Sequence, residues 1–174
     1  LETTNLAING AMIQMISHGL ISAALFLCIG VMYDRLQTRK ISDYGGVITV
    51  MPKFGALMVF FALSNAALPG TSGFVGEFII ILASFKINAW IAMMAATTLV
   101  IGAFYTLWML KRVIFGTVVN EKINSLKEIT FIESLPLCLL ATSILAMGLW
   151  PGPLFDLMSN SINALSEFIL SKAS

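Results

Sequence analysis

The sequence predicts an all-α membrane protein with about four transmembrane helices, the second of them discontinuous, followed by a C-terminal interfacial amphipathic helix. Three observations lead to this prediction. Charged residues make up only 11% of the 174 residues and apolar residues make up 58%, whereas soluble domains contain roughly a quarter charged residues. The apolar residues gather in long runs, and the mean hydropathy is +0.92. One of these runs is interrupted by proline and glycine.

Four apolar segments are long enough to cross a hydrocarbon layer of ~30 Å at ~1.5 Å per residue. The predicted transmembrane region covers residues 1–155. Its four segments cover residues 6–32, 54–85, 87–110 and 132–155. Residues 156–174 are predicted to form the interfacial helix and tail, because apolar residues recur there at amphipathic spacing. The chain begins with Leu1 rather than Met, and we expect it to be a piece of a longer polypeptide.

The second segment is too long for one straight crossing, since a helix over residues 54–85 would measure ~48 Å. As a hairpin, each of its arms would have only ~15 residues, which is short for a crossing. Basic residues flank the second and third segments: Arg35, Arg39, Lys40 and Lys53 come before them, and Lys111, Arg112, Lys122 and Lys127 come after. A single crossing puts both basic loops on the same side, as the positive-inside rule favours. We therefore predict one broken crossing, with a proline kink or two re-entrant arms as alternatives.

The break is predicted near residues 69–73, at Pro69, Gly70 and Gly73. Proline removes a backbone donor, and glycine permits non-helical backbone. Unpaired backbone at membrane depth is tolerated only inside protein or beside a water-filled cavity, and transporters use broken helices at ion sites. The predicted topology places both chain ends outside, and places the loops 33–53 and 111–131 on the cytoplasmic or matrix side.

Glu77 is the one carboxylate well inside an apolar run, about one turn after the predicted break. Thr71 or Ser72 is expected to cap the helix that follows the break. The positive end of that helix favours the ionised carboxylate, whereas burial favours the protonated one. A group balanced in this way suits proton transfer, and an intramembrane carboxylate is a functional-site hypothesis by default. The alternative is a permanent ion pair with a lysine or arginine outside this chain.

His18 is the only histidine in the sequence, and it lies in the middle of the first segment. With Gln14, Ser17 and Ser22 it forms a polar stripe at helical spacing. Lipid would penalise such a stripe, so we expect it to face other helices or water. Imidazole accepts and donates protons near neutral pH, which suits a proton relay. A hydrogen bond to a neighbouring helix, without titration, is the alternative.

Four residues are candidates for a secondary role along a proton path. Gln14 and Ser22 belong to the stripe on the first segment. The hydroxyl of Tyr105, with that of Thr98 on the same predicted helix, could line a hydrated path, although hydroxyl groups also serve ordinary helix packing. Lys53 stands at the mouth of the broken segment, where it is either a proton-entry group or, as we prefer, an interfacial anchor.

Several kinds of chemistry have no support in the sequence. It contains no Gly-rich dinucleotide fingerprint, no P-loop and no Cys-x-x-Cys pair, and Cys28 and Cys138 stand alone inside apolar runs. We predict no metal site and no cofactor in this chain. The net charge of +1 gives no reason to expect a nucleic-acid partner, so the lipid bilayer is the expected environment.

Several stretches of the sequence resemble a known family. These are QMISHGL at residues 14–20, GVMYDR at 30–35, DYGG at 43–46 and LPGTSGFVGEF at 68–78. They are similar to NADH dehydrogenase subunit 4 of respiratory complex I, whose bacterial form is subunit M of NADH-quinone oxidoreductase. The resemblance covers nearly the whole chain and is strongest up to Gly116.

The resemblance implies that the chain forms the last four of the family's fourteen spans, in a subunit that pumps protons. Glu77 would be the carboxylate of the family's broken helix, and His18 the histidine of span eleven. Flavin, iron–sulfur clusters and quinone are expected in partner subunits, so this chain would belong to an enzyme without doing redox chemistry itself. The implied partners are the other membrane subunits of complex I, including the neighbouring antiporter-like ones. The implied location is the bacterial or the mitochondrial inner membrane.

Three alternatives to a complex I subunit stay open at this point. Subunits of Mrp-type cation/proton antiporters and of membrane-bound hydrogenases are similar, although the antiporter-like paralogues usually have lysine where Glu77 stands. A purely structural membrane subunit would leave Glu77 in one protonation state.

Overall fold

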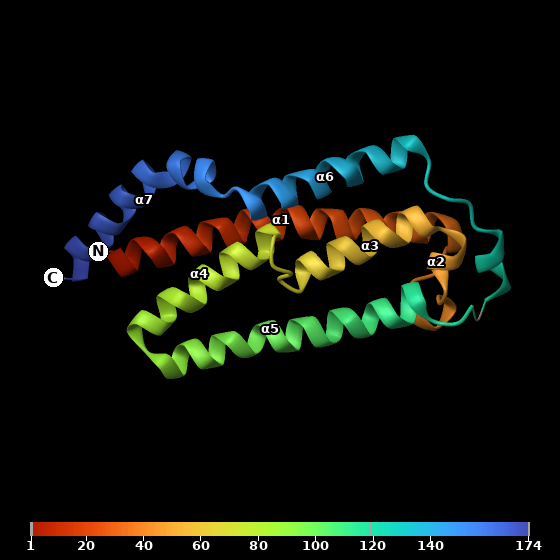
Figure 1. Cartoon of the computed structure of the whole chain (residues 1–174), viewed down its shortest axis with the longest axis horizontal. Coiled ribbons are helices and arrows are strands. Elements are labelled where there is room, and N and C mark those ends of the chain that lie inside the picture. Colours follow the sequence, from red (N-terminus) through yellow and green to blue (C-terminus); the bar gives the residue numbers. More distant parts are fainter. Residues whose placement is uncertain (1, 119, 174) are drawn as a thin grey trace.

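The computed structural model describes residues 2–118 and 120–173, and all regular secondary structure in these residues is helical (Figure 1). The elements are α1 (Glu2–Leu36), η1 (Ile41–Asp43), α2 (Val47–Val50), α3 (Pro52–Asn65), α4 (Ser72–Ile87), α5 (Ala89–Leu110), the π-helix η2 (Lys111–Phe115), η3 (Glu121–Ser125), α6 (Phe131–Leu149) and α7 (Gly152–Ala173). The predicted all-α class is confirmed.

Within residues 2–118 and 120–173, three helices are long and apolar enough to cross a membrane on their own. These are α1, the continuous helix formed by α5 and η2, and α6. The predicted second segment is divided between α3, with 14 residues, and α4, with 16 residues. Each of the two is shorter than the ~20 residues that a crossing needs.

α1 is the longest helix, and α3, α4, α6 and α7 pack against it (Figure 1). α3 and α4 follow one another along one side of α1, and α5 returns beside them. α6 and α7 run back along another side of α1. The most deeply buried side chains, among them Phe54, Phe61, Leu137 and Ile144, fill the space between α1, α3 and α6.

α1 and α4 approach each other closely because each helix has a glycine, without a side chain, at their contact. A Cβ atom at Gly10 would lie 2.8 Å from Cγ2 of Ile79, and one at Gly76 would lie 2.9 Å from Cα of Gln14. Small residues at helix interfaces let backbones approach closely in membrane proteins. The close approach brings Gln14 against the first two turns of α4.

The C-terminal boundaries differ from the prediction. The sequence predicts that the fourth apolar segment continues to residue 155, but α6 ends at Leu149, and α7 begins at Gly152 rather than at Asp156. Pro151 and Gly152 account for the interruption, since proline has no backbone donor and glycine has low helix propensity. α7 then packs along the N-terminal part of α1, where Asn5 Nδ2 donates to Asn163 Oδ1 at 2.9 Å. Its interfacial placement stays a prediction.

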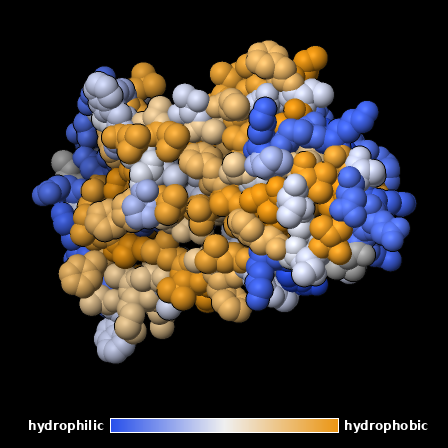
Figure 2. All heavy atoms as spheres, turned by 45° about the vertical axis from the view of Figure 1, so that its right-hand side comes forward, coloured by the Kyte–Doolittle hydropathy of each residue, from blue (hydrophilic) through white to orange (hydrophobic). Residues whose placement is uncertain are grey.

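Large apolar side chains are exposed over much of the surface. Phe104 on α5 is 74% exposed and Ile132 on α6 is 82% exposed. Figure 2 shows apolar residues across the middle of one face and hydrophilic residues toward its ends. A large exposed apolar surface marks contact with lipid or with other protein.

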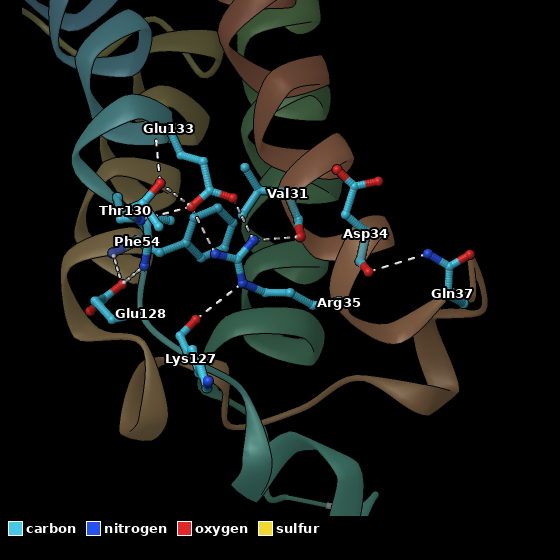
Figure 3. A network of polar contacts seen from close by, with 10 residues as sticks. Val31, Asp34, Arg35, Gln37, Phe54, Lys127, Glu128, Thr130 and Glu133 are labelled. Atoms are coloured by element: carbon cyan, nitrogen blue, oxygen red, sulfur yellow. Dashed lines mark hydrogen bonds and ion pairs between the residues drawn. The ribbon is translucent and has the colours of Figure 1, made fainter.

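A polar network joins three helix ends on the side where the basic residues gather (Figure 3). Arg35, in the last turn of α1, forms an ion pair with Glu133 in the first turn of α6. Glu133 also completes a capping box with Thr130. The carboxylate of Glu128 accepts hydrogen bonds from the backbone N–H groups of Lys53 and Phe54 at the start of α3.

Candidate functional site

The backbone between α3 and α4 is non-helical from residue 66 to residue 71. Gly70 has φ +93°, which glycine adopts without a steric penalty, and Ala67 has φ +56°, where an L side chain is rare. Pro69 lies in the turn between these two residues. Gly73 follows in the first turn of α4, where a Cβ atom would lie 2.5 Å from the carbonyl oxygen of Ser64. Pro69 and Gly70 therefore lie within the interruption, and Gly73 lies just after it in the first turn of α4.

The start of α4 is held by a contact that the sequence did not predict. Thr71 occupies the N-cap position, but its side chain makes no capping hydrogen bond. Its hydroxyl instead donates to the carbonyl of Leu68 at 2.7 Å. Ser72 does not cap the helix either, since its hydroxyl pairs with that of Ser17 on α1 at 2.7 Å, and both serines are fully buried. The expected cap by Thr71 or Ser72 was wrong, because the Thr71 hydroxyl is used by the turn before α4 and the Ser72 hydroxyl by Ser17 on α1.

A cavity of about 220 Å³ lies beside the interruption. It is lined by His18, Asn65, Ala66, Glu77, Thr98, Leu99, Gly102 and Tyr105. These residues come from α1, the end of α3, α4 and α5. A polar cavity needs about 10–15 Å³ to hold one water molecule, and a water occupies about 30 Å³ in the liquid, so this one has room for several.

Glu77 lies in the second turn of α4 and is half-buried. Its Oε1 atom accepts a hydrogen bond of 3.1 Å from Nε2 of Gln14 on α1. No lysine or arginine lies within salt-bridge distance of Glu77 among the described residues. The carboxyl group therefore has one neutral partner within these residues and otherwise faces the cavity.

His18 lies one turn after Gln14 on α1, and its side chain is exposed. Its Nε2 atom lies 3.2 Å from Oγ of Ser22. Which atom donates depends on the tautomer of the imidazole ring. His18 and Glu77 line the same cavity.

The structure brings most of the predicted site residues together, with one exception. Glu77, His18 and Tyr105 share the cavity, Gln14 contacts Glu77, and Ser22 contacts His18. Lys53 lies in the first turn of α3, at the other end of that helix and ~18 Å along it from Asn65. Its backbone N–H donates to Glu128 at 2.8 Å, as expected for a residue at a helix end.

Asn65 is a cavity residue that the sequence analysis missed. Its Nδ2 atom donates to Oγ1 of Thr106 on α5 at 3.4 Å, which ties the end of α3 to α5. The available signal was a carboxamide in an apolar run, four residues before Pro69 at the predicted break. A metal site finds no support in the described residues, where no three His, Cys, Asp or Glu side chains cluster.

A carboxyl group, an imidazole and a hydroxyl group line a polar cavity between long apolar helices, and these helices place the chain among integral membrane proteins. The chain belongs to the NADH:quinone oxidoreductase/Mrp antiporter transmembrane family, whose model matches residues 1–102. This confirms the predicted family. With its three long apolar helices, the chain is a multi-pass inner-membrane protein.

Similar proteins are subunits of respiratory assemblies. The chain is 43% identical to NADH-quinone oxidoreductase subunit M of Rhodobacter capsulatus over 92% of its own length and 31% of that protein. It is 43% identical to NADH-ubiquinone oxidoreductase chain 4 of Chondrus crispus, over 91% of its own length and 32% of that protein. Among solved structures, respiratory complex I from Thermus thermophilus with bound NADH matches 95% of this chain and 34% of that one, with a TM-score of 0.86 and 26% identity. The chain thus spans about a third of the length of these relatives.

Proposed function

We propose that the chain is the C-terminal part of a proton-translocating, antiporter-like subunit of NADH:quinone oxidoreductase. In this proposal Glu77 gains and loses a proton as electrons pass from NADH to quinone in partner subunits. Flavin, iron–sulfur clusters and quinone belong to those partners, and this chain does no redox chemistry. The observation that carries the proposal is the cavity beside the interrupted helix, with Glu77 and His18 on its wall.

We further propose that α3, residues 66–71 and α4 form one discontinuous crossing, which brings the number of crossings to four. Two observations support this. α3 and α4 follow one another along α1 (Figure 1). Both basic loops lie at the same end, since α2 contacts η2 and η3 there. The positive-inside rule then assigns that end to the cytoplasm or matrix.

The surroundings of Glu77 suit a group that changes its protonation state. The N-terminus of α4, with its partial positive charge, lies about one turn away and favours the ionised carboxylate. Partial burial favours the protonated form, and no fixed cation among the described residues holds it ionised. Small changes in hydration or in nearby charge can therefore move the proton.

His18 and Tyr105 have the role of passing protons between the cavity water and Glu77. Both side chains line the cavity, and imidazole can accept one proton while it donates another. Ser22 orients the ring of His18 through the 3.2 Å contact with Nε2. Lys53 lies at the opposite end of α3 and has no part in this step.

The test is Glu77→Gln in the assembled complex, with protons translocated per NADH oxidised as the readout. Glutamine keeps the shape of the side chain and removes its proton exchange. The expected result is a lower ratio while electron transfer with an uncoupler continues. Glu2→Gln is the matched control, because Glu2 is 92% exposed at the start of α1. An unchanged ratio in Glu77→Gln would remove Glu77 from the pathway.

A cation/proton antiporter subunit is a second candidate, because the matching family covers Mrp antiporters as well. The two candidates differ in what drives proton movement. Proton flux that requires Na⁺ and proceeds without NADH would favour the antiporter, whereas flux that requires NADH oxidation would favour the complex I subunit.

A further inference from the structure

Only one of the two polar atoms of the Gln14 side-chain amide has a hydrogen-bond partner among the described residues. Its Nε2 atom donates to Glu77 Oε1 at 3.1 Å, but its Oε1 atom is buried and has no hydrogen-bond partner among the described residues. A buried acceptor without a partner is destabilising, and such groups are rare in native proteins. An unsatisfied buried atom beside a titratable group therefore calls for an explanation.

The packing around Gln14 fixes the place of the amide. Gly76, one residue before Glu77, has no side chain, and a Cβ atom there would lie 2.5 Å from Gln14 Oε1 and 2.9 Å from its Cα. Gln14 therefore lies directly against the backbone of α4. The amide cannot move away from Glu77 without opening this contact, but it can rotate about its own terminal bond, where the torsional preference is broad.

The protonation state of Glu77 determines which atom of the Gln14 amide can form a hydrogen bond with its carboxyl group. An ionised carboxylate only accepts hydrogen bonds, so it pairs with the amide N–H, as in this structure. A protonated carboxyl group has an O–H that donates, and it can pair with the amide oxygen. Since the amide N and O are nearly equal in size, a half-turn exchanges them in the same space.

We infer that Gln14 is a positioning residue for Glu77, which pairs with both protonation states of the carboxyl group through a half-turn of its amide. The inference rests on the proposed function, and it explains the unpartnered oxygen as the acceptor used when Glu77 is protonated. His18 on α1 and Tyr105 on α5 are the other titratable side chains among the described residues that line the cavity. Neither of them contacts the carboxyl group as Gln14 does, through a direct hydrogen bond.

The experiment compares the pH profile of proton translocation in the assembled complex for Gln14→Met and Gln14→Leu. Both variants fill the space of Gln14 without an amide. The bond to the ionised form is the stronger of the two that are lost, because hydrogen bonds to charged groups exceed neutral ones. The profile should therefore move toward higher pH by about one unit. Ser17→Ala is the control, since Ser17 pairs with Ser72 across the same helix contact and not with Glu77.

The outcomes separate this inference from the proposed function. If Glu77→Gln lowers the translocation ratio but neither Gln14 variant moves the profile relative to Ser17→Ala, the role of Gln14 is overturned and that of Glu77 stands. If Glu77→Gln has no effect, the proposed function fails first. If neither Gln14 variant assembles while Ser17→Ala does, Gln14 is required for packing, and its positioning role is also overturned.

Discussion

Arg35 and Glu133 are joined by two parallel hydrogen bonds of 2.9 Å each, although they are 98 residues apart in the sequence (Figure 3). The same guanidinium group donates to the carbonyl oxygens of Lys127 and Val31. A planar guanidinium matches a carboxylate in this two-pronged geometry, and an ammonium group does not. The pair therefore fixes the end of α1 to the beginning of α6.

Replacing Arg35 by lysine should destabilise the protein although the charge is kept. The side chains of Arg35 and Glu133 are 15% and 30% exposed, so the pair is partly shielded from water. We expect a loss of about 1–2 kcal/mol, below the full value of a charge-assisted pair because of the remaining solvent. Thermal unfolding in detergent measures it. Lys86→Met is the control, because the 3.5 Å pair of Lys86 with Glu2 is more exposed, at 41% and 92%. An equal loss in both variants would contradict the assignment.

Glu128 should stabilise the start of α3 from outside that helix. Its carboxylate accepts from the backbone N–H groups of Lys53 at 2.8 Å and Phe54 at 3.2 Å, next to the positive end of the helix. Glu128→Ala should cost about 1 kcal/mol and accelerate hydrogen exchange at these two amides. Glu121→Ala in the same loop is the control. Unchanged protection at Lys53 and Phe54 would show that the cap is unimportant.

Gly73 should not tolerate a larger residue. A Cβ atom there would lie 2.5 Å from the backbone oxygen of Ser64, and backbone cannot move aside as a flexible side chain can. Gly73→Ala should destabilise the protein by about 1–3 kcal/mol and separate α4 from the end of α3. Gly30→Ala is the matched control, because a Cβ atom at Gly30 would meet no other atom within 4 Å. Equal melting temperatures for the two variants would contradict the close approach.

Thr38 should keep the pKa of Asp43, in the connection between α1 and α2, below its ordinary value. Its hydroxyl donates to Asp43 Oδ2 at 2.6 Å, and this hydrogen bond is the main reason that the pKa of Asp43 is lowered. Because the folded-state pKa lies below the unfolded one, the contribution to stability is complete above the unfolded value of ~3.9 and is lost as pH falls through the folded value. Thr38→Val should raise the pKa of Asp43, which carbon NMR of its carboxyl group measures. No change would mean that another donor replaces Thr38.

The features that depend on neighbouring residues in the chain could be predicted from the sequence. Long apolar runs predicted α1, α5 and α6, and the resemblance predicted the family. Pro69 and Gly70 located the interruption to within a few residues, since proline and glycine act on their own backbone. The end of α6 was misplaced because hydropathy continues past Trp150, whereas the helix does not.

The contacts that complete the site depend on residues distant in sequence. Nothing near Ser72 shows that its hydroxyl pairs with Ser17, 55 residues away, instead of capping α4. The polar stripe on the first segment suggested Gln14, but only the fold places its amide on Glu77, 63 residues away. Asn65 was overlooked because only the fold shows that α3 ends at the cavity, where the side chain of Asn65 forms part of the wall.

The central claim is that Glu77 changes its protonation state during turnover, and infrared difference spectroscopy tests it most directly. Spectra of the assembled complex, recorded with and without electron transfer from NADH, should contain a carbonyl stretch from a protonated carboxyl group. That band should disappear in Glu77→Gln and persist in Glu2→Gln. Identical difference spectra for the original protein and Glu77→Gln would contradict the claim, because Glu77 would then keep one protonation state throughout.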